Sequence, residues 1–246
     1  MNNYQFCIQW ILLRRASANN IHVLDYGCGA GEIVKELRNQ EVNAFGCDIF
    51  YGGGDYSVSI DPIFWEQAII RRMEGNTIPF DRDSFDFVIN NQVMEHVKDL
   101  NRVLAEIHRV LKPGGMVLSL FPDKNIWREV HWGIPFLHWF SKGSRARIFY
   151  AALFRALGFG HHKTCKNIIH WSNDACDWLD QWTHYRTERT IKQSYCQFFN
   201  DIQHIEDYWL QQRLGTGGVV SRLPRSIQRF IARKLAGVIF IARKAF

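Results

Sequence analysis

The chain has 246 residues, of which 47% are hydrophobic and 22% are charged, and its formal net charge is +6. This length suits one α/β domain with a sizeable insertion, and the composition excludes a disordered or fibrous chain. No run approaches the ~20 apolar residues that a membrane-spanning helix needs. The six cysteines form no C-x-x-C pair, so we expect neither a zinc site nor a disulfide framework, and we place the protein in the cytoplasm.

Hydrophobic periodicity predicts strands alternating with helices through the first half of the chain. The expected strands are residues 21–25, 43–47, 85–90, 116–121 and 237–243. The expected helices are residues 2–19, 32–39, 61–72, 100–111 and 223–235. Residues 123–173 and 174–214 are aromatic or helical in pattern, and we interpret both as an insertion that covers a substrate.

Residues 21–31, I-H-V-L-D-Y-G-C-G-A-G, predict a buried strand that runs into a glycine turn and then a helix. Glycine adopts positive φ without steric cost, and its missing Cβ lets a ligand approach the backbone. Dinucleotide enzymes use G-x-G-x-x-G, but the last glycine of that pattern falls on Glu32, which would repel a pyrophosphate. The turn instead suits an uncharged nucleoside, with Asp25 facing an ammonium group.

Further matches follow in order along the chain: residues 45–48 (F-G-C-D), 73–80 (M-E-G-N-T-I-P-F), 85–97 (F-D-F-V-I-N-N-Q-V-M-E-H-V) and 109–115 (R-V-L-K-P-G-G). With the glycine turn, they resemble the class I S-adenosylmethionine (SAM)-dependent methyltransferases of type 11, with a cofactor domain like that of ubiquinone and menaquinone biosynthesis. The resemblance implies a Rossmann-like, seven-stranded, mostly parallel α/β sheet with helices on both faces and a mainly helical insertion. It implies one domain: a SAM-binding half at 1–121, a lid at about 122–218, and a C-terminal helix and strand at 219–246.

The resemblance also implies which residues bind SAM and release S-adenosylhomocysteine. Asp25 would order the methionine amino group, and Asp48 would accept the ribose hydroxyls. The full set of expected cofactor residues is Asp25, Gly27, Cys28, Gly29, Gly31, Asp48, Ile49, Glu74, Gly75 and Asn90. Asn90 could equally be only a turn residue.

Glu95 and His96 fall on the helix expected after strand 85–90. Some similar methyltransferases carry E-x-x-E-H there and bind a divalent metal. Here Gln92 replaces the first glutamate, and a neutral amide is a weaker ligand for a hard cation. We therefore predict a structural Glu-His pair and no metal site.

The segment after strand 116–121 offers Asp123, Glu129, His131 and His138 as candidates for a catalytic base. His131 is the preferred candidate, because its ordinary pKa suits proton transfer near neutrality. The alternative is that His131 only packs the lid.

Charge is uneven in the second half of the chain. No acidic residue occurs between positions 130 and 173, where six cations are found: Lys142, Arg145, Arg147, Arg155, Lys163 and Lys166. A solvated basic surface is the usual explanation of such a segment, and an anionic acceptor, phosphate-bearing or otherwise, is the equal alternative because the segment borders the expected acceptor site. Residues 208–246 hold eight basic residues and no acidic one, and the helix at 223–235 could lie on the sheet or hold the protein at an anionic inner membrane face.

The sequence therefore predicts methyl transfer to a small-molecule hydroxyl on a sugar, a glycolipid or another anionic metabolite. The second half is loosely similar to methyltransferases of bacterial surface-polysaccharide biosynthesis. The alternatives are RNA methylation, disfavoured because no RNA-binding module is recognisable, and a SAM-binding scaffold without catalysis. Oligomeric state stays open.

Overall fold

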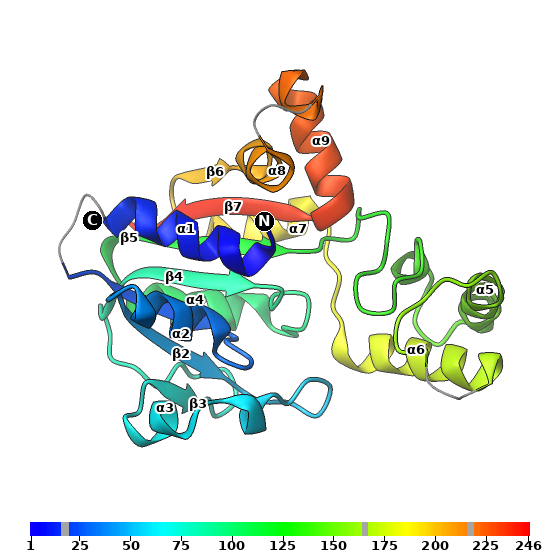
Figure 1. Ribbon diagram of the computed structural model, residues 1–246, viewed down its shortest axis with the longest axis horizontal. Helices are drawn as coiled ribbons and strands as arrows, with labels where there is room; N and C mark the ends of the chain where they lie inside the picture. The colour runs from blue at the N-terminus through cyan, green and yellow to red at the C-terminus, as the bar shows by residue number, and fades with distance from the viewer. Residues whose placement is uncertain (16–19, 164–166, 216–218) are drawn as a thin grey trace.

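The computed structural model describes residues 1–15, 20–163, 167–215 and 219–246, and it contains one seven-stranded sheet in the order β3-β2-β1-β4-β5-β7-β6 (Figure 1). The strands are β1 (His22–Tyr26), β2 (Asn43–Asp48), β3 (Ile70–Arg72), β4 (Phe85–Asn91), β5 (Leu111–Phe121), β6 (Ile202–His204) and β7 (Val238–Arg243). All neighbouring pairs are parallel except β5 with β7 and β6 with β7, which are antiparallel. The predicted mostly parallel α/β sheet is confirmed.

Helices cover both faces of the sheet. They are α1 (Asn3–Arg15), α2 (Glu32–Asn39), α3 (Pro62–Glu66), α4 (Leu100–Val110), α5 (Arg145–Ala156), α6 (Ile168–Trp182), α7 (Glu188–Tyr195), α8 (Glu206–Leu214) and α9 (Arg225–Ala236). Alternate strand residues point to opposite faces, so Val23 joins a core with α1, α2, α8 and α9, whereas Leu24 joins a second core with α4 and α7.

A third apolar core lies outside the sheet. It joins the segment after β5 to α5 and α6, through residues such as Ile134, Leu137, Ala151, Trp171 and Leu179. Figure 1 shows α5 and α6 beyond the carboxyl ends of the parallel strands, with α5 farthest from the sheet. The hairpin of α5 and α6 therefore stands next to the edge at which ligands bind in open α/β sheets.

Two expected elements differ from the structure. The helix predicted over 61–72 ends at Glu66, although Asp61 caps it by accepting the Ile63 N–H at 3.1 Å. Ala68 is left-handed (φ 50°), and the buried Ile70 then pairs with Gly46 as part of β3. The mainly helical lid expected at about 122–218 also contains β6, which is a strand of the main sheet.

Other expectations fall partly outside the described residues. These are the end of the first predicted helix (16–19), Cys165 and Lys166. The cysteines of the described part are free thiols. No helix within the described ranges is long and apolar enough to cross a membrane.

Candidate active site

The glycine turn between β1 and α2 is held against the end of β2. Gly27 and Cys28 donate their backbone N–H groups to the Cys47 carbonyl at 2.8 and 3.2 Å. Gly27, Gly29 and Gly31 all have positive φ, at 75°, 51° and 76°. A Cβ on Gly27 would lie 2.4 Å from Val93 Cγ2, so the turn has no room for a side chain there.

Asp48 closes this turn from the end of β2. Its carboxylate accepts the Gly29 N–H at 2.9 Å and the Phe50 N–H at 2.8 Å. Burial raises the pKa of Asp48, although these backbone hydrogen bonds oppose the shift. One carboxylate therefore fixes the glycine turn and the start of the following loop together.

A cavity of about 590 Å³ opens between the glycine turn and the segment after β5. Its wall includes Tyr4, Asp25, Gly27, Cys28, Gly29, Asp48, Ile49, Tyr51, Tyr56, Met73, Asn76, Asn91, Gln92, His96, Lys98, His131 and Trp178. Six expected cofactor residues and the expected base therefore share one cavity. Gly31 stands beside it, at the start of α2.

Three expected cofactor residues lie elsewhere. Glu74 is exposed, and neither it nor Gly75 is part of the wall, where Met73 and Asn76 stand instead. Asn90 is fully buried and donates its amide to Ser119 Oγ at 2.8 Å, pointing into the core. Asn90 lies in β4, where successive side chains point to opposite faces, and its neighbour Asn91 is the residue that lines the cavity; Glu74 and Gly75 lie in the turn after β3. The cofactor role of these three residues stays a prediction.

Several cavity residues were not predicted from the sequence. Tyr4 comes from α1, Tyr51 and Tyr56 come from the loop after β2, and Trp178 comes from α6. Tyr51 and Tyr56 flank the three glycines at 52–54, and this local pattern is the signal that could have identified them. No local pattern connects Tyr4 or Trp178 with the glycine turn.

Two carboxylates dominate the electrostatics at the turn, the buried Asp25 and the half-buried Asp48. Asp25 is 3% exposed, and burial, with a smaller contribution from the charge of Asp48, raises its pKa to about 8. Placing a cation beside the pair would favour ionisation of both. The cavity therefore suits a ligand with positive charge at this end.

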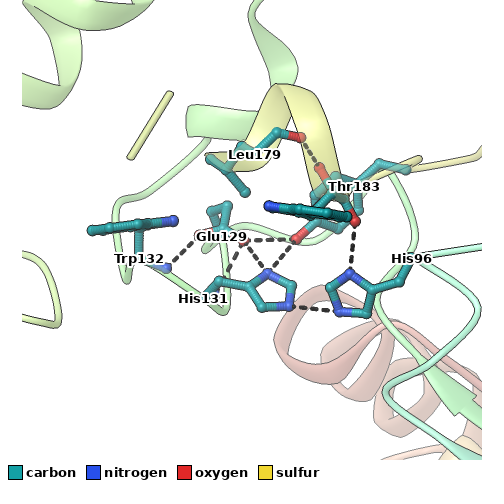
Figure 2. Close-up of polar contacts among 8 residues, drawn as sticks. His96, Glu129, His131, Trp132, Leu179 and Thr183 are labelled. Atoms are coloured by element: carbon teal, nitrogen blue, oxygen red, sulfur yellow. Dashed lines mark hydrogen bonds and ion pairs between the residues drawn. The ribbon is translucent and has the colours of Figure 1, made fainter. Parts of the chain in front are cut away.

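A second polar centre in the wall joins two histidines from distant parts of the chain (Figure 2). His131 donates Nδ1–H to Glu129 Oε1 at 2.7 Å, and its Nε2 lies 3.2 Å from Nε2 of His96. His96 donates its own Nδ1–H to the Trp182 carbonyl at 2.7 Å. The Nε2 atoms of the two rings therefore face each other. Two unprotonated nitrogens at this distance repel, whereas one proton between them forms a hydrogen bond.

Glu129 is the fixed partner of this pair. It is fully buried and also accepts hydrogen bonds from the Trp132 N–H at 2.6 Å and the Tyr185 hydroxyl at 2.7 Å. Burial would raise the pKa of Glu129, but the interaction with His131 and these donors lower it to about 2. Burial would likewise lower the pKa of His131, but Glu129 raises it above its ordinary value.

His96 has the opposite tendency, because burial lowers its pKa to about 4. The pKa of His131 is therefore higher than that of His96, so a proton that the two Nε2 atoms share is held by His131, which then donates Nε2–H to His96. The sequence interpretation of Glu95 and His96 as residues of a helix is wrong, because residues 92–99 form no helix. This turn is what directs the His96 ring toward His131.

Glu95, His96 and His131 offer ligand atoms that lie within 4.8 Å of one another. Glu95 is buried, neither of its carboxylate oxygens has a hydrogen-bond partner in the described part of the chain, and burial raises its pKa to about 7. Gln92, which replaces the first glutamate of the metal-binding pattern, lines the same cavity. The prediction that no metal binds here stays a prediction.

The other candidate bases do not reach the cavity. Asp123 is buried and accepts a hydrogen bond from Asn125 at 2.8 Å, and His138 contacts the Lys124 carbonyl at 3.2 Å. The basic segment is also absent from the wall as far as its described residues go. Arg147 pairs with Asp180, and Lys142 donates to two backbone carbonyls, so neither cation is directed at a ligand.

Comparison with known proteins agrees with this arrangement. Residues 24–119 match the family described as a methyltransferase domain. The chain is 31% identical over 145 residues to a demethylmenaquinone methyltransferase of Symbiobacterium thermophilum, covering 52% of this chain and 57% of that protein. It is 26% identical over 124 residues to a ubiquinone biosynthesis O-methyltransferase of Acinetobacter baumannii, covering 48% and 51%. The chain thus spans about half the length of the curated relatives that it matches.

The fold has solved counterparts as well. A SAM-dependent methyltransferase from Mesorhizobium loti superposes with a TM-score of 0.53 over 98% of this chain and all of that chain, at 16% identity. Similarity at this level of identity shows a shared fold. The segment that matches the methyltransferase-domain family, residues 24–119, includes the glycine turn, Asp48 and β4. It ends before Glu129 and His131.

Proposed function

We propose that the chain is a class I SAM-dependent methyltransferase that transfers a methyl group from SAM to a hydroxyl group of a small-molecule acceptor; the methyltransferase-domain match and the similar quinone-biosynthesis methyltransferases support this proposal. The observation that carries the proposal is one cavity with a glycine turn at one side and the histidine pair at the other. S-Adenosylhomocysteine is the second product.

The described residues fit the cofactor. A Cβ on Gly29 would meet only Tyr56, at 3.7 Å, so the backbone there is open to a ligand in the cavity. Asp48 stands at the end of β2, where ribose hydroxyls would be accepted. SAM carries an ammonium group and a sulfonium, and Asp25 is a buried carboxylate whose ionisation a nearby cation would favour. SAM supplies a methyl group already activated by its positive sulfur.

Two contributions then come from this chain. Holding the acceptor oxygen in line with the carbon–sulfur bond can supply about 7 to 11 kcal/mol through proximity alone. The acceptor oxygen forms the new bond to the methyl carbon, the electron pair of the breaking bond goes to sulfur, and the hydroxyl proton goes to neutral His131 Nε2. Glu129 stabilises the resulting imidazolium, and His96 Nε2 accepts its hydrogen bond.

The acceptor we propose is a sugar or glycolipid hydroxyl, bound against an aromatic wall. Tyr51 and Trp178 both line the cavity, and the Trp178 ring centre lies 4.9 Å from that of His131. Such rings pack against the apolar face of a sugar ring, and equally against a phenol. Lys98 is the cation of the described wall, so an acidic group on the acceptor would find a partner there.

The test is transfer of a labelled methyl group from SAM in a cell extract, separated into water-soluble, lipid, nucleic-acid and protein fractions. The Asp48→Ala variant is the control for cofactor dependence. Label in the water-soluble or lipid fraction supports the proposal, and sugar against phenol acceptors then separates the two ring classes. Label in nucleic acid would support RNA methylation, and SAM binding without label in any fraction would support a scaffold.

A further inference from the structure

The α5–α6 hairpin carries an exposed apolar surface that the cavity does not use. On α5 and just past its end, Phe149, Leu153 and Leu157 recur every four residues, with exposed fractions of 71%, 58% and 65%. This spacing places them along one side of a helix. The opposite side of α5 is buried, since Ala151 packs with Trp171 in the third core. The hairpin is therefore apolar on its outer side as well as its inner side.

Neighbouring residues extend this surface. We define the outer hairpin surface as Phe149, Leu153, Leu157, Phe159, Ile168 and Ile169, each of which is at least 41% exposed. The last two begin α6, which packs against α5 in the third core. Single exposed apolar residues are ordinary, but six on one short hairpin are typical of an interaction site.

The charges around this surface favour an anionic partner. No acidic residue lies between positions 130 and 173. Arg145 and Lys163 are exposed, and the Arg155 guanidinium lies over the Trp171 ring at 5.5 Å. In the described part of the chain, none of these three cations forms an ion pair, whereas Arg147 is neutralised by Asp180. A second copy of the chain would bring like charges together, which disfavours self-association.

The position of the hairpin suits a flat partner such as a membrane. Figure 1 shows α5 at the end of the molecule farthest from the sheet, so a flat surface can cover it without touching the glycine turn. Apolar side chains beside cations are what binds a helix to the interface of an anionic bilayer. We propose that the outer hairpin surface docks on an anionic phospholipid bilayer.

The C-terminal helix is a weaker membrane surface than its sequence indicates. Arg229 pairs with Asp207 at 3.0 Å, and Arg233 pairs with Glu206 at 2.9 Å and Glu188 at 2.7 Å. These ion pairs neutralise the positive charge that would attract lipid headgroups. Ile227 and Leu235 are nevertheless 43% and 58% exposed, so α9 supplies a matched control of similar apolar exposure.

Docking by the hairpin has a consequence for the cavity. α6 carries Trp178, which lines the cavity, on the same helix whose first turn carries Ile168 and Ile169. A membrane-bound hairpin would therefore hold the acceptor side of the cavity close to the bilayer. The docking itself needs no methyl transfer, so its test is independent of the proposed reaction.

The experiment is co-sedimentation of the purified full chain with vesicles of phosphatidylcholine alone or of phosphatidylcholine mixed with phosphatidylglycerol. The test variant is Phe149→Ser/Leu153→Ser/Leu157→Ser, and the control variant is Ile227→Ser/Leu235→Ser. We expect binding to the anionic vesicles that weakens with added salt and falls about tenfold or more in the test variant. The control variant should bind like the wild type.

Thermal unfolding and SAM binding of both variants verify that the fold persists. A wild-type chain that ignores anionic vesicles, or a test variant that binds as well as the wild type, would refute the proposal. Loss of vesicle binding in the control variant would show that α9 forms the membrane-binding surface, against the proposal. A stable dimer that the test variant dissociates would identify the outer hairpin surface as an interface between copies.

Discussion

Replacement of His131 by asparagine tests the proposed chemistry most directly. Asparagine keeps a polar group near Glu129 but has no basic nitrogen to take a proton. A positioned base contributes about 10²- to 10⁴-fold to a rate, which corresponds to roughly 3 to 5 kcal/mol at about 1.4 kcal/mol for each tenfold. We expect the kcat of His131→Asn to fall within that range, with SAM affinity unchanged because Asp25 and Asp48 are untouched.

His138→Asn is the matched control for this substitution. His138 lies in the same segment, is also buried, and contacts the Lys124 carbonyl at 3.2 Å, but it is not part of the cavity wall. Burial lowers its pKa to about 4, so asparagine preserves its neutral state. This control should lose some stability and keep its kcat.

Stability must be followed alongside the rate, because His131→Asn leaves the buried Glu129 carboxylate without its charged partner. Breaking such a pair costs about 3 to 5 kcal/mol, whereas the double variant Glu129→Gln/His131→Asn avoids the unpaired charge. Initial rates with labelled SAM, measured well below each melting temperature, separate the two effects. Folded single and double variants that keep most of the wild-type kcat would refute the proposal that His131 is the base.

Three further results are expected. Glu129→Gln removes the charge that raises the pKa of His131, while burial still lowers that pKa. The rising limb of the kcat–pH profile should therefore move to lower pH, and an unmoved limb would exclude His131 as the titrating base. Asp48→Ala should weaken SAM binding in calorimetry about tenfold to a hundredfold, as expected for lost charged hydrogen bonds, whereas Asp55→Ala, on the exposed loop, should leave it unchanged. Gly31→Ala, with a Cβ 2.6 Å from an Ile70 methyl and φ at 76°, should lower the free energy of urea unfolding by about 1 to 3 kcal/mol, and wild-type stability would contradict the packing.

The fold of the first half of the chain could be predicted because its signals are local. The glycine turn, the acid at the end of β2 and the helix 32–39 each depend on residues within a few positions of one another. Such patterns follow from backbone geometry, since only glycine accepts these φ values without cost and only a strand end presents Asp48 to the turn. The helix of 61–72 failed for a related reason, since the left-handed Ala68 that ends it has no glycine to mark it.

The acceptor half could not be predicted to the same depth, because its contacts join residues far apart in sequence. His131 and His96 are 35 positions apart, and Tyr185 reaches Glu129 from 56 positions away. The sequence singled out His131 by its ordinary pKa, but it treated His96 as a structural residue of a helix. Only the fold shows that both Nδ1–H groups are occupied and that both Nε2 atoms are directed at one point.

This division has a physical origin in what each ligand requires. A cofactor of fixed shape can be held by backbone groups and by side chains at strand ends. Proteins that share the sheet can therefore share the cofactor site. An acceptor varies, and the site that we propose for it is assembled from the segment after β5, the turn after β4 and helix α6, all of which lie outside the sheet. The buried Glu129 compensates for this freedom, since one carboxylate accepts hydrogen bonds from Trp132, His131 and Tyr185 and thereby fixes the His131 ring. On the proposed mechanism, substitutions at Tyr51 or Trp178 would change the acceptor while the histidine pair stays in place.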